Sequence, residues 1–336
     1  MKQRKRSLVL CRVGLLLALV LGTALCAAQT AQSQSKGSSE RFPSRPVRLV
    51  ITHKAGGITD LPARIVQPYF EKYLGATVII ENMDGAGGNI ARSFVYKQPA
   101  DGYTLLVTVQ PSLSSGAIVS DGDYDPLKFV PVYNITGKGY QGVGVHYASP
   151  FKNMKELIAA AKKKPMTAGG AGVGGNSFIV MALLNQKTGT KFDYVPFNST
   201  TEAALALAGG HIDTALSGYP ALIPLQDQKK VRIIAMSGPE RAELLPDVPT
   251  ITEQGFPGIE VDQLVSVFAP PALPKDRLDA LTVAFEKAFK DQGLIKAAKE
   301  GKFVLKPMGG EKLRKETVAL HQMIQDIAPV LKEAMK

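Results

Sequence analysis

The chain contains 336 residues, of which 45% are hydrophobic and 21% are charged. This balance is typical of a globular protein, and it excludes both a wholly disordered chain and a protein with many membrane spans. With 40 Lys and Arg against 29 Asp and Glu, the formal net charge is +11. A chain of this length usually folds into two domains.

The N-terminal segment has the pattern of a secretory signal peptide. Five basic residues and no acidic residue fall within 1–12, and an apolar run follows from Val13 to Leu25. That run is too short to span a bilayer, which takes about 20 apolar residues. Small residues favour cleavage after Ala28, so we predict a signal peptide over 1–28 and a flexible polar leader over 29–43. The expected location is the periplasm.

Cleavage changes both the charge and the chemistry of the mature chain. It removes five basic residues, so the net charge falls from +11 to +6. No dense basic run with interleaved aromatic residues remains, and nucleic-acid binding is therefore not expected. Both cysteines, Cys11 and Cys26, lie in the removed segment, so we expect no disulfide and no cysteine-bound metal. A lipid anchor on Cys26 is the alternative, but Leu25 before it is larger than such processing prefers.

Strands alternate with helices along the mature chain. The predicted strands cover 46–52, 77–80, 103–109, a mixed region within 126–146, 194–197, 231–237 and an extended segment over 256–267. The predicted helices cover 60–74, 89–98, 153–164, 176–187, 199–208, 276–290 and 311–333. Capping boxes mark two of the starts, Asn153 with Glu156 and Ser199 with Glu202. Between them we predict a Gly-rich loop over 167–175.

The alternation of strands and helices predicts an α/β fold with largely parallel sheets. Two sheet-forming blocks are followed by C-terminal helices, which indicates two similar lobes. We predict that 44–142 and 266–336 form lobe 1 and that 143–265 forms lobe 2. The chain would cross between the lobes near 141–147 and 262–267, where a hinge is expected.

A search for catalytic chemistry finds no complete motif. The histidines His53, His146, His211 and His321 form no close pair with metal-binding spacing, and the chain has no nucleophile elbow and no P-loop. We therefore predict no enzyme, no cofactor and no metal. His53 lies beside the first Gly-rich turn, and it is either a ligand contact or a strand-end residue with a structural role.

One segment formally matches a dinucleotide-binding fingerprint. Gly170–Gly175 fits G-x-G-x-x-G and precedes a predicted helix. That fingerprint also requires an acidic residue at the end of the next strand. Asp193 has about the right spacing but lies before the strand 194–197, so nucleotide binding is not favoured.

Three turns instead lead directly into helix N-termini: Ala55–Asp60, Gly170–Ser177 and Asn198–Thr201. Glycine lets the backbone approach a ligand closely, and a helix start presents unpaired N–H groups with a partial positive charge. Hydroxyl groups such as those of Thr59 and Ser199 can add donors. Such a site can bind an anion without Lys or Arg. The alternative is that these segments are only tight turns and caps.

Five ordered motifs identify a resemblance. They are Arg45–Val50 with Ala55–Arg64, Glu81–Asn89, Asp101–Leu105, Tyr124–Pro126 and Leu245–Gly255. Together they resemble the substrate-binding receptors of tripartite tricarboxylate transporters, the Bug or TctC family, over nearly all of the mature chain. The resemblance implies a two-lobed type II periplasmic binding protein fold with a ligand cleft between the lobes. It also implies a monomer that captures a small carboxylate and delivers it to a permease of two integral membrane subunits.

An alternative role on the same fold is a ligand-sensing subunit for a membrane sensor kinase. In the family two loops act as a pincer on a ligand carboxylate, partly through ordered water. Here those loops correspond to Ala55–Asp60 and Gly170–Ser177, and Thr108–Ser112 matches a further cleft-lining stretch. The residues implied for the ligand site are Ala55, Gly56, Gly57, Thr59, Asp60, Gln110, Ser112, Gly172, Gly174, Asn176, Ser177, Phe178, Phe197, Asn198, Ser199, Ser217, Gly218 and Tyr219.

The chain departs from the family pattern in the distal half of the implied pocket. Many members have Ser-His at Ser177-Phe178, Tyr-Lys-Gly at Phe197-Asn198-Ser199 and Asp-Asn at Ser217-Gly218, where Tyr219 follows. These changes remove charged groups and add aromatic ones. They suggest that one carboxylate is held as usual while the rest of the ligand is less charged than citrate. The alternative is that Phe178 and Phe197 point into the core.

Overall fold

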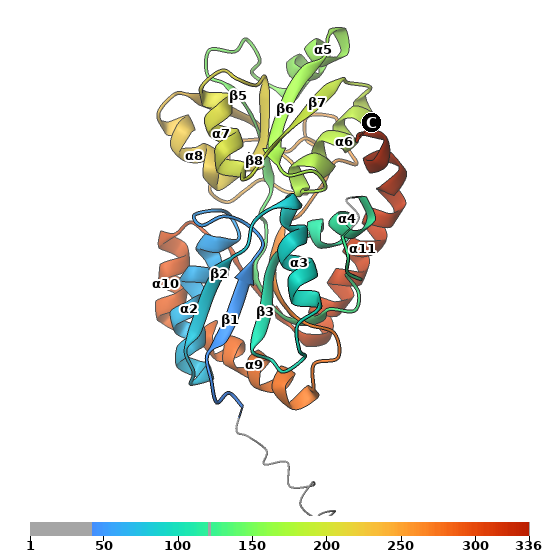
Figure 1. Cartoon of the computed structure of the whole chain (residues 1–336). Helices are drawn as coiled ribbons and strands as arrows, with labels where there is room; N and C mark the ends of the chain where they lie inside the picture. Colours follow the sequence, from blue (N-terminus) through green and yellow to red (C-terminus); the bar gives the residue numbers. More distant parts are fainter. Residues whose placement is uncertain (1–41, 120–121, 336) are drawn as a thin grey trace, which may run out of the picture. The chain divides into compact units, whose positions relative to one another are not determined.

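The computed structural model describes residues 42–119 and 122–335. The chain divides into a unit that ends at Ser44 and a compact unit that starts at Arg45. The predicted signal peptide, 1–28, and nearly all of the predicted leader, 29–43, lie outside the described residues. The compact unit contains two β-sheets, each covered by helices (Figure 1).

The first sheet has six strands in the order β11-β4-β10-β3-β1-β2. The strands are β1 (Val47–Ile51), β2 (Val78–Asn82), β3 (Thr104–Gln110), β4 (Val130–Thr136), β10 (Leu264–Ala269) and β11 (Leu305–Gly309). Every residue of β3 is buried, as expected for an apolar central strand covered on both faces. Strand β1 pairs in parallel with β2 and β3, whereas β10 pairs antiparallel with β3 and β4.

Helices cover both faces of this sheet. They are α2 (Asp60–Leu74), α3 (Asn89–Tyr96) after the short η1 (Ala86–Gly88), α4 (Ser112–Val119), α9 (Lys275–Ala288) and α10 (Gln292–Glu300). In α2 the buried residues Ala63, Val66 and Phe70 recur at intervals of three and four, which places them on one helix face. The ring of Phe70 stacks on Phe285 of α9 with 3.8 Å between centroids, so α2 and α9 share a core.

The second sheet has five strands in the order β7-β6-β8-β5-β9. The strands are β5 (Gln141–His146), β6 (Met166–Ala171), β7 (Phe192–Phe197), β8 (Thr214–Gly218) and β9 (Val231–Met236). The helices around it are α5 (Met154–Lys163), α6 (Asn176–Thr188), α7 (Thr200–Ala208) and α8 (Tyr219–Asp227). Both predicted N-caps form, because Asn153 accepts a hydrogen bond from the Glu156 N–H and Ser199 accepts one from the Glu202 N–H. The Glu side chains accept from the residue before each cap, Lys152 and Asn198, so the reciprocal half of each predicted capping box is displaced by one residue.

The chain passes between the sheets through the segment from β4 to β5 and the segment from β9 to β10. The two segments meet where the Gly139 N–H donates to the Gln263 carbonyl at 3.3 Å. The Gln141 Nε2 also donates to the Gln263 Oε1 at 2.5 Å. The lobe boundaries given by the sequence stay a prediction.

The long C-terminal helix α11 (Gly310–Glu333) contacts both lobes. Near its start Leu313 packs with Leu264 and Met308 of the first sheet. Further along, Ile324 and Leu331 are fully buried in the hydrophobic core that covers α6. Figure 1 shows α11 running beside α4 and then α6. A single helix therefore contacts both lobes in addition to the crossing segments.

The expectation of largely parallel sheets is wrong, since both sheets are mixed. The strands that follow the two crossings, β5 and β10, run antiparallel to both of their neighbours. Each of these strands enters its sheet from the other lobe. It therefore runs in the direction opposite to the parallel strands of that sheet. The predicted elements also leave out α4, β8, α8, α10 and β11. In α8, Pro220 and Pro224 weaken the helical pattern.

The predicted Gly-rich loop over 167–175 is also corrected, because its first half is strand β6. A Cβ on Gly169 would lie 2.4 Å from the Ile212 Cδ1, and a Cβ on Gly170 would lie 2.3 Å from the Ser177 Cβ. Glycine is therefore needed here for close packing against neighbouring side chains. The true turn begins at Gly172, whose φ is +55°.

Candidate functional site

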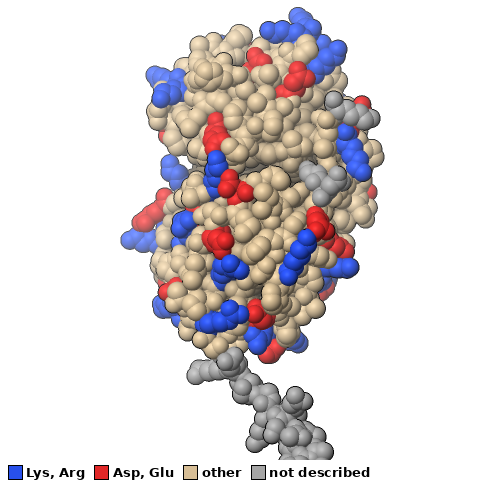
Figure 2. Space-filling model, viewed as in Figure 1, with Lys and Arg blue, Asp and Glu red and all other residues tan. Residues whose placement is uncertain are grey.

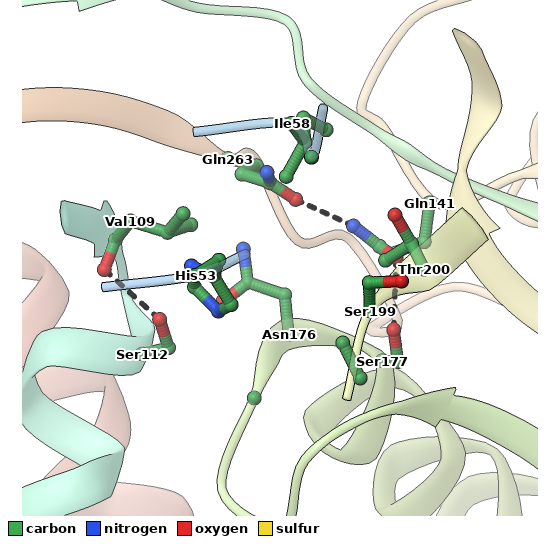
Figure 3. Close-up of a pocket in the computed structure, with 13 residues that line it drawn as sticks. His53, Ile58, Val109, Ser112, Gln141, Asn176, Ser177, Ser199, Thr200 and Gln263 are labelled. Carbon is green, nitrogen blue, oxygen red and sulfur yellow. Dashed lines mark hydrogen bonds between the residues drawn. The ribbon is translucent and has the colours of Figure 1, made fainter. Parts of the chain in front are cut away.

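A small cavity lies where the two lobes meet, and Figure 3 shows the side chains around it. The first lobe contributes His53, Gly57, Ile58, Val109 and Ser112. The second lobe and the crossing segments contribute Gln141, Ala171, Gly175, Asn176, Ser177, Ser199, Thr200 and Gln263. The cavity volume is about 30 Å³, which accommodates one or two water molecules or a single carboxylate group.

Helix N-termini face this cavity from both lobes. Helices α4, α6 and α7 begin at Ser112, Asn176 and Thr200, all of which line the cavity. The first N–H groups of an α-helix have no partner within the helix, and the helix dipole adds a partial positive charge there. Because none of the described residues that line the cavity is Asp or Glu, these partial charges are not cancelled locally.

Asn176 presents an unpaired acceptor to the cavity. Its Nδ2 donates to the Gln110 carbonyl at 3.2 Å, which fixes the orientation of the amide. Its Oδ1 is buried and has no hydrogen-bond partner among the described residues. Leaving a buried polar atom unpaired is costly, so this oxygen calls for a donor from water or from a bound molecule.

His53 is held in a fixed orientation at the first-lobe wall. Its Nδ1 lies 2.9 Å from both the Thr52 Oγ1 and the Thr59 Oγ1. Desolvation, followed by the positive charge of Arg92, lowers the pKa of His53 from 6.5 to about 4. The imidazole is therefore neutral at neutral pH and offers hydrogen bonding without a charge.

This pKa predicts an acid-sensitive stability. The unfolded chain takes up a proton on His53 near pH 6.5, whereas the folded protein does so only near pH 4. The free energy of unfolding therefore falls as the pH decreases from about 6.5 to 4, by up to about 3 kcal/mol from this group. We expect His53→Gln to flatten this part of the curve in urea unfolding at a series of pH values. His146→Gln, outside the cavity, is the matched control, and an unchanged slope in His53→Gln would contradict the assignment.

A buried guanidinium group lies directly behind the cavity wall. Arg92 on α3 is only 1% exposed, and its Nη2 donates to the Ser112 Oγ at 3.1 Å. Its other donors are received by the Thr108 Oγ1, the Gly87 carbonyl and the Asn89 Oδ1, all neutral groups at 3.1 Å. Among the described ion pairs none includes Arg92. A buried charge is costly unless an opposite charge lies nearby, so Arg92 favours an anion in the cavity.

The sequence drew attention to several of these residues but not to all of them. Among the predicted site residues, Gly57, Ser112, Asn176, Ser177 and Ser199 line the cavity. The sequence search left His53 open and missed Arg92, Gln141 and Gln263. These residues come from separate parts of the chain, and no local motif connects them. For Arg92, the sequence offered one signal of a buried charge, namely a single Arg within a mostly apolar helix.

Other predicted residues support the cavity from behind. Burial alone would raise the pKa of Asp60, but hydrogen bonds from Arg64, the Gly56 N–H and Asn82 outweigh it and hold the pKa below its ordinary value. Its ionised carboxylate thus ties the first turn together. Thr59 at the start of α2 bonds to His53 and does not cap the helix.

Gln110, Ser217 and Gly174 also lie behind the cavity wall. The Gln110 Nε2 donates to the Ser266 Oγ at 3.0 Å, and the Ser217 Oγ donates to the Thr200 carbonyl at 3.0 Å. The Gly174 carbonyl accepts from the Ser115 Oγ of the first lobe. None of these three lines the cavity, while Ala55 is exposed on the first turn.

The structure does not bring the predicted aromatic residues to this cavity. Phe178 is 1% exposed and packs edge-on against Tyr194 in the core of the second lobe, because α6 is buried on nearly all sides. Tyr219 lines a separate small cavity with Gly137, and Gly218 lines a third. Phe197 and the exposed Asn198 lie with Gly172 at a larger cavity of about 380 Å³, which His53 also lines from its other side. The aromatic pocket predicted from Phe178 is therefore corrected.

The dinucleotide interpretation finds no support in the geometry. Asp193 is exposed at the start of β7, where it lies across from Thr167. The Gly-rich turn follows Ala171 at the opposite end of the same strand pair. An acidic residue at that distance cannot contact a ligand bound at the turn.

The two lobes are in direct contact around the cavity. A Cβ on Gly172 would lie 2.7 Å from the Gly87 Cα, so the backbones of two Gly-rich turns touch. A salt bridge also joins Lys54 of the first lobe to Glu202 of the second, with 3.3 Å between Nζ and Oε1. These contacts describe a closed arrangement of the lobes around the cavity.

The outer surface carries charges of both signs. On the face shown in Figure 2, basic and acidic residues are interspersed over both lobes. Within 42–119 and 122–335, no group of three His, Cys, Asp or Glu residues could hold a metal ion. In the same ranges no helix combines the length and the apolar character needed to cross a membrane.

Two α/β lobes that close on a cleft lined by helix N-termini define a two-lobed periplasmic binding protein, which confirms the predicted fold class. The chain belongs to the tripartite tricarboxylate transporter family receptors, TctC, whose family model matches residues 62–328. The resemblance seen in the sequence motifs is thereby confirmed. Members of this family are periplasmic solute-binding receptors and not enzymes.

Individual relatives agree with this assignment. A Cupriavidus necator protein, described as a UPF0065 protein in the gbd 5' region, is 35% identical over 265 residues, or 78% of this chain and 79% of its own. The Rhodopseudomonas palustris protein Rpa4515 with adipate has a TM-score of 0.79 at 26% identity, covering 86% of this chain and 98% of its own. MatC from the same organism with bound malate has a TM-score of 0.75 at 27% identity, covering 88% and 100%.

Proposed function

We propose that this protein captures a small carboxylate in the cleft between its lobes and delivers it to the two-subunit membrane permease of a tripartite tricarboxylate transporter. Export by the N-terminal signal peptide would bring it to the periplasm. The family assignment supports the transport partner, because the matching model describes the receptor of that transporter. Two similar structures carry adipate and malate, both of them carboxylates.

The observation that carries the proposal is the arrangement of helix N-termini and a buried arginine around a cavity whose described lining residues include no Asp, Glu, Lys or Arg. The N-termini of helices α4, α6 and α7 face the cavity. The buried Arg92 lies behind the cavity wall, where it donates to the side chain of Ser112. A carboxylate in the cavity would lie within about 7 Å of the guanidinium, two contact lengths away. At an effective dielectric constant of about 20, this attraction is worth roughly 2–3 kcal/mol.

These interactions suffice for a receptor of ordinary affinity. A micromolar Kd corresponds to about −8 kcal/mol. Hydrogen bonds to a charged group contribute roughly 1.5–3 kcal/mol each. Three of them from the first turns of the helices, together with the attraction of Arg92, reach that range before the costs of ordering the ligand are counted.

We propose that the lobes open and close about the crossing segments near 137–140 and 262–263. The strand bounds support these positions over the 141–147 and 262–267 expected from the sequence, because β5 begins at Gln141 and β10 begins at Leu264. The bonds between Gln141, Gln263 and Ser177 then form at the hinge side of the cleft. Helix α11 also bridges the lobes, so the motion must bend or slide this contact.

A ligand screen tests the proposal. We expect the purified protein, unfolded and refolded to remove any carried ligand, to be stabilised by at least one member of a panel of adipate, malate, citrate and hexanoate. When the ligand concentration is a hundred times Kd, binding raises the free energy of unfolding by about 2.7 kcal/mol. A thermal melt resolves a change of this size. The neutral amides adipamide and hexanamide are the matched controls. Equal stabilisation by acids and amides, or stabilisation by neither, would contradict carboxylate capture.

A further inference from the structure

The small cavity lined by Asn176 and Ser177 is called the polar cavity below. A second cavity adjoins it at the lobe boundary. It has a volume of about 320 Å³, within the range of small-ligand pockets. Its walls are mostly apolar and come from α2, α7, α8 and the segment before β11. They include Leu61, Leu205, Pro220, Pro224, Leu225 and Phe303. None of the described residues that line it is charged.

The two cavities share a wall. Ile58 and Thr200 line both of them, one from each lobe. Ile58 packs over Gly218, where an added Cβ would lie only 2.6 Å from the Ile58 Cδ1. Ile58 and Thr200 therefore form the wall that separates the polar cavity from the apolar one.

Two leucines of the apolar cavity are exposed although they belong to the lobe boundary. Leu61 on α2 is 43% exposed and Leu205 on α7 is 56% exposed. They approach the cavity from opposite lobes, so closure brings their apolar surfaces to the same space. A ligand segment between them would bury both and would hold the lobes together.

We propose that the ligand is a carboxylic acid with one charged end and an apolar tail, and that the tail passes Ile58 into the cavity lined by Leu61 and Leu205. This inference rests on the proposed function, because the polar cavity holds the carboxylate. The tail binds through the hydrophobic effect, which contributes roughly a three- to fourfold gain in affinity for each buried methylene.

The other space beside the polar cavity is a poor place for a second carboxylate. The cavity of about 380 Å³ beyond His53 is lined by the exposed carboxylate Asp84, and none of the described residues that line it is Lys or Arg. The apolar cavity offers no charged partner, so a second carboxylate there would lose its hydration without compensation. An apolar tail meets neither penalty. Continuity with the ligand cavity through Ile58 and Thr200 also favours a ligand segment as the occupant over a separate protein partner.

A homologous series of acids tests the inference. We expect the Kd measured by calorimetry to fall roughly three- to fourfold per methylene from butanoate to octanoate, and hexanoate to bind at least tenfold more tightly than adipate. If adipate binds and hexanoate does not, the inference is overturned while the proposed function stands. If none of these acids binds, nor malate or citrate, the proposed function itself fails.

Variants locate the tail. Leu205→Asp places a charge in the apolar cavity at an exposed helix position, so the fold should be unaffected. We expect it to abolish the dependence on chain length and to weaken octanoate binding at least tenfold. Butanoate meets only the longer-range repulsion of the new carboxylate and should be weakened less than octanoate. Ile295→Asp, on α10 outside the cavity and 44% exposed, is the matched control and should keep the series intact. A full chain-length dependence in Leu205→Asp would place the tail elsewhere and overturn the inference.

Discussion

The Arg92→Gln variant is expected to bind carboxylates about a hundredfold more weakly than the parent protein. Among the residues that the structure describes, Arg92 is the one buried arginine. Its guanidinium lies beside the cavity wall, and its described partners are all neutral. The attraction estimated for a carboxylate in the cavity, roughly 2–3 kcal/mol, corresponds to about two orders of magnitude in Kd. Because the charge is shielded from solvent, we expect most of the loss to persist at high salt.

Two further variants separate charge from packing. Arg92→Lys keeps the positive charge and should retain affinity within about tenfold. Arg48→Gln removes an arginine of the same lobe that pairs with Glu81 outside the cavity, and it should bind like the parent protein. Calorimetry measures Kd, and circular dichroism checks the fold of each variant. If folded Arg92→Gln binds normally, or if Arg92→Lys loses as much as Arg92→Gln, Arg92 does not act as the counter-charge.

The Gly172→Ala variant is expected to lose ligand-induced closure and to bind at least tenfold more weakly. The new Cβ would lie 2.7 Å from the Gly87 Cα of the other lobe. This contact is with backbone, which cannot rotate away as a side chain can. The lobes would then remain apart, and a ligand would be held by one lobe alone. Small-angle scattering with and without a saturating acid measures the closure.

A second glycine controls for backbone strain. Gly172 and Gly189 both have positive φ, +55° and +67°, so alanine is strained at either position. Nothing lies within 4 Å of a Cβ on Gly189, which ends α6. Gly189→Ala should therefore lose some stability but close normally on the ligand. Normal compaction in Gly172→Ala, or equal loss of affinity in both variants, would contradict a role for the Gly87 contact in closure.

Local patterns predicted those elements that depend on local chemistry. Helix α2 forms over Asp60–Leu74 as expected, because its apolar residues recur on one face and Gly75 ends it with φ of +73°. The N-caps at Asn153 and Ser199 also form as predicted. Strand direction could not be predicted in this way, because β5 and β10 owe theirs to the crossings between lobes.

The site was predictable only in part for a similar reason. Gly-rich turns before helices are visible in sequence, and they led to Asn176, Ser177 and Ser199, which line the cavity. Arg92 reaches the cavity through Ser112, a partner 20 positions away, and Gln141 meets Gln263 across 122 positions. Such pairs are created by the fold. The hypothesis of a less charged ligand rested on missing charged groups and on the aromatic residues Phe178, Phe197 and Tyr219. Phe178 lies in the core, and the other two line other cavities. The apolar surface near the cleft comes from residues that the sequence did not single out.

A crystal structure with the tightest-binding acid of the panel tests the central claim most directly. We predict one carboxylate group in the polar cavity, with its oxygens within about 3.2 Å of the N–H groups in the first turn of α6. We also predict that no Lys or Arg side chain contacts it directly, because Arg92 acts from behind Ser112. A carboxylate bound outside this cavity, or one held by a surface Lys or Arg, would contradict the account.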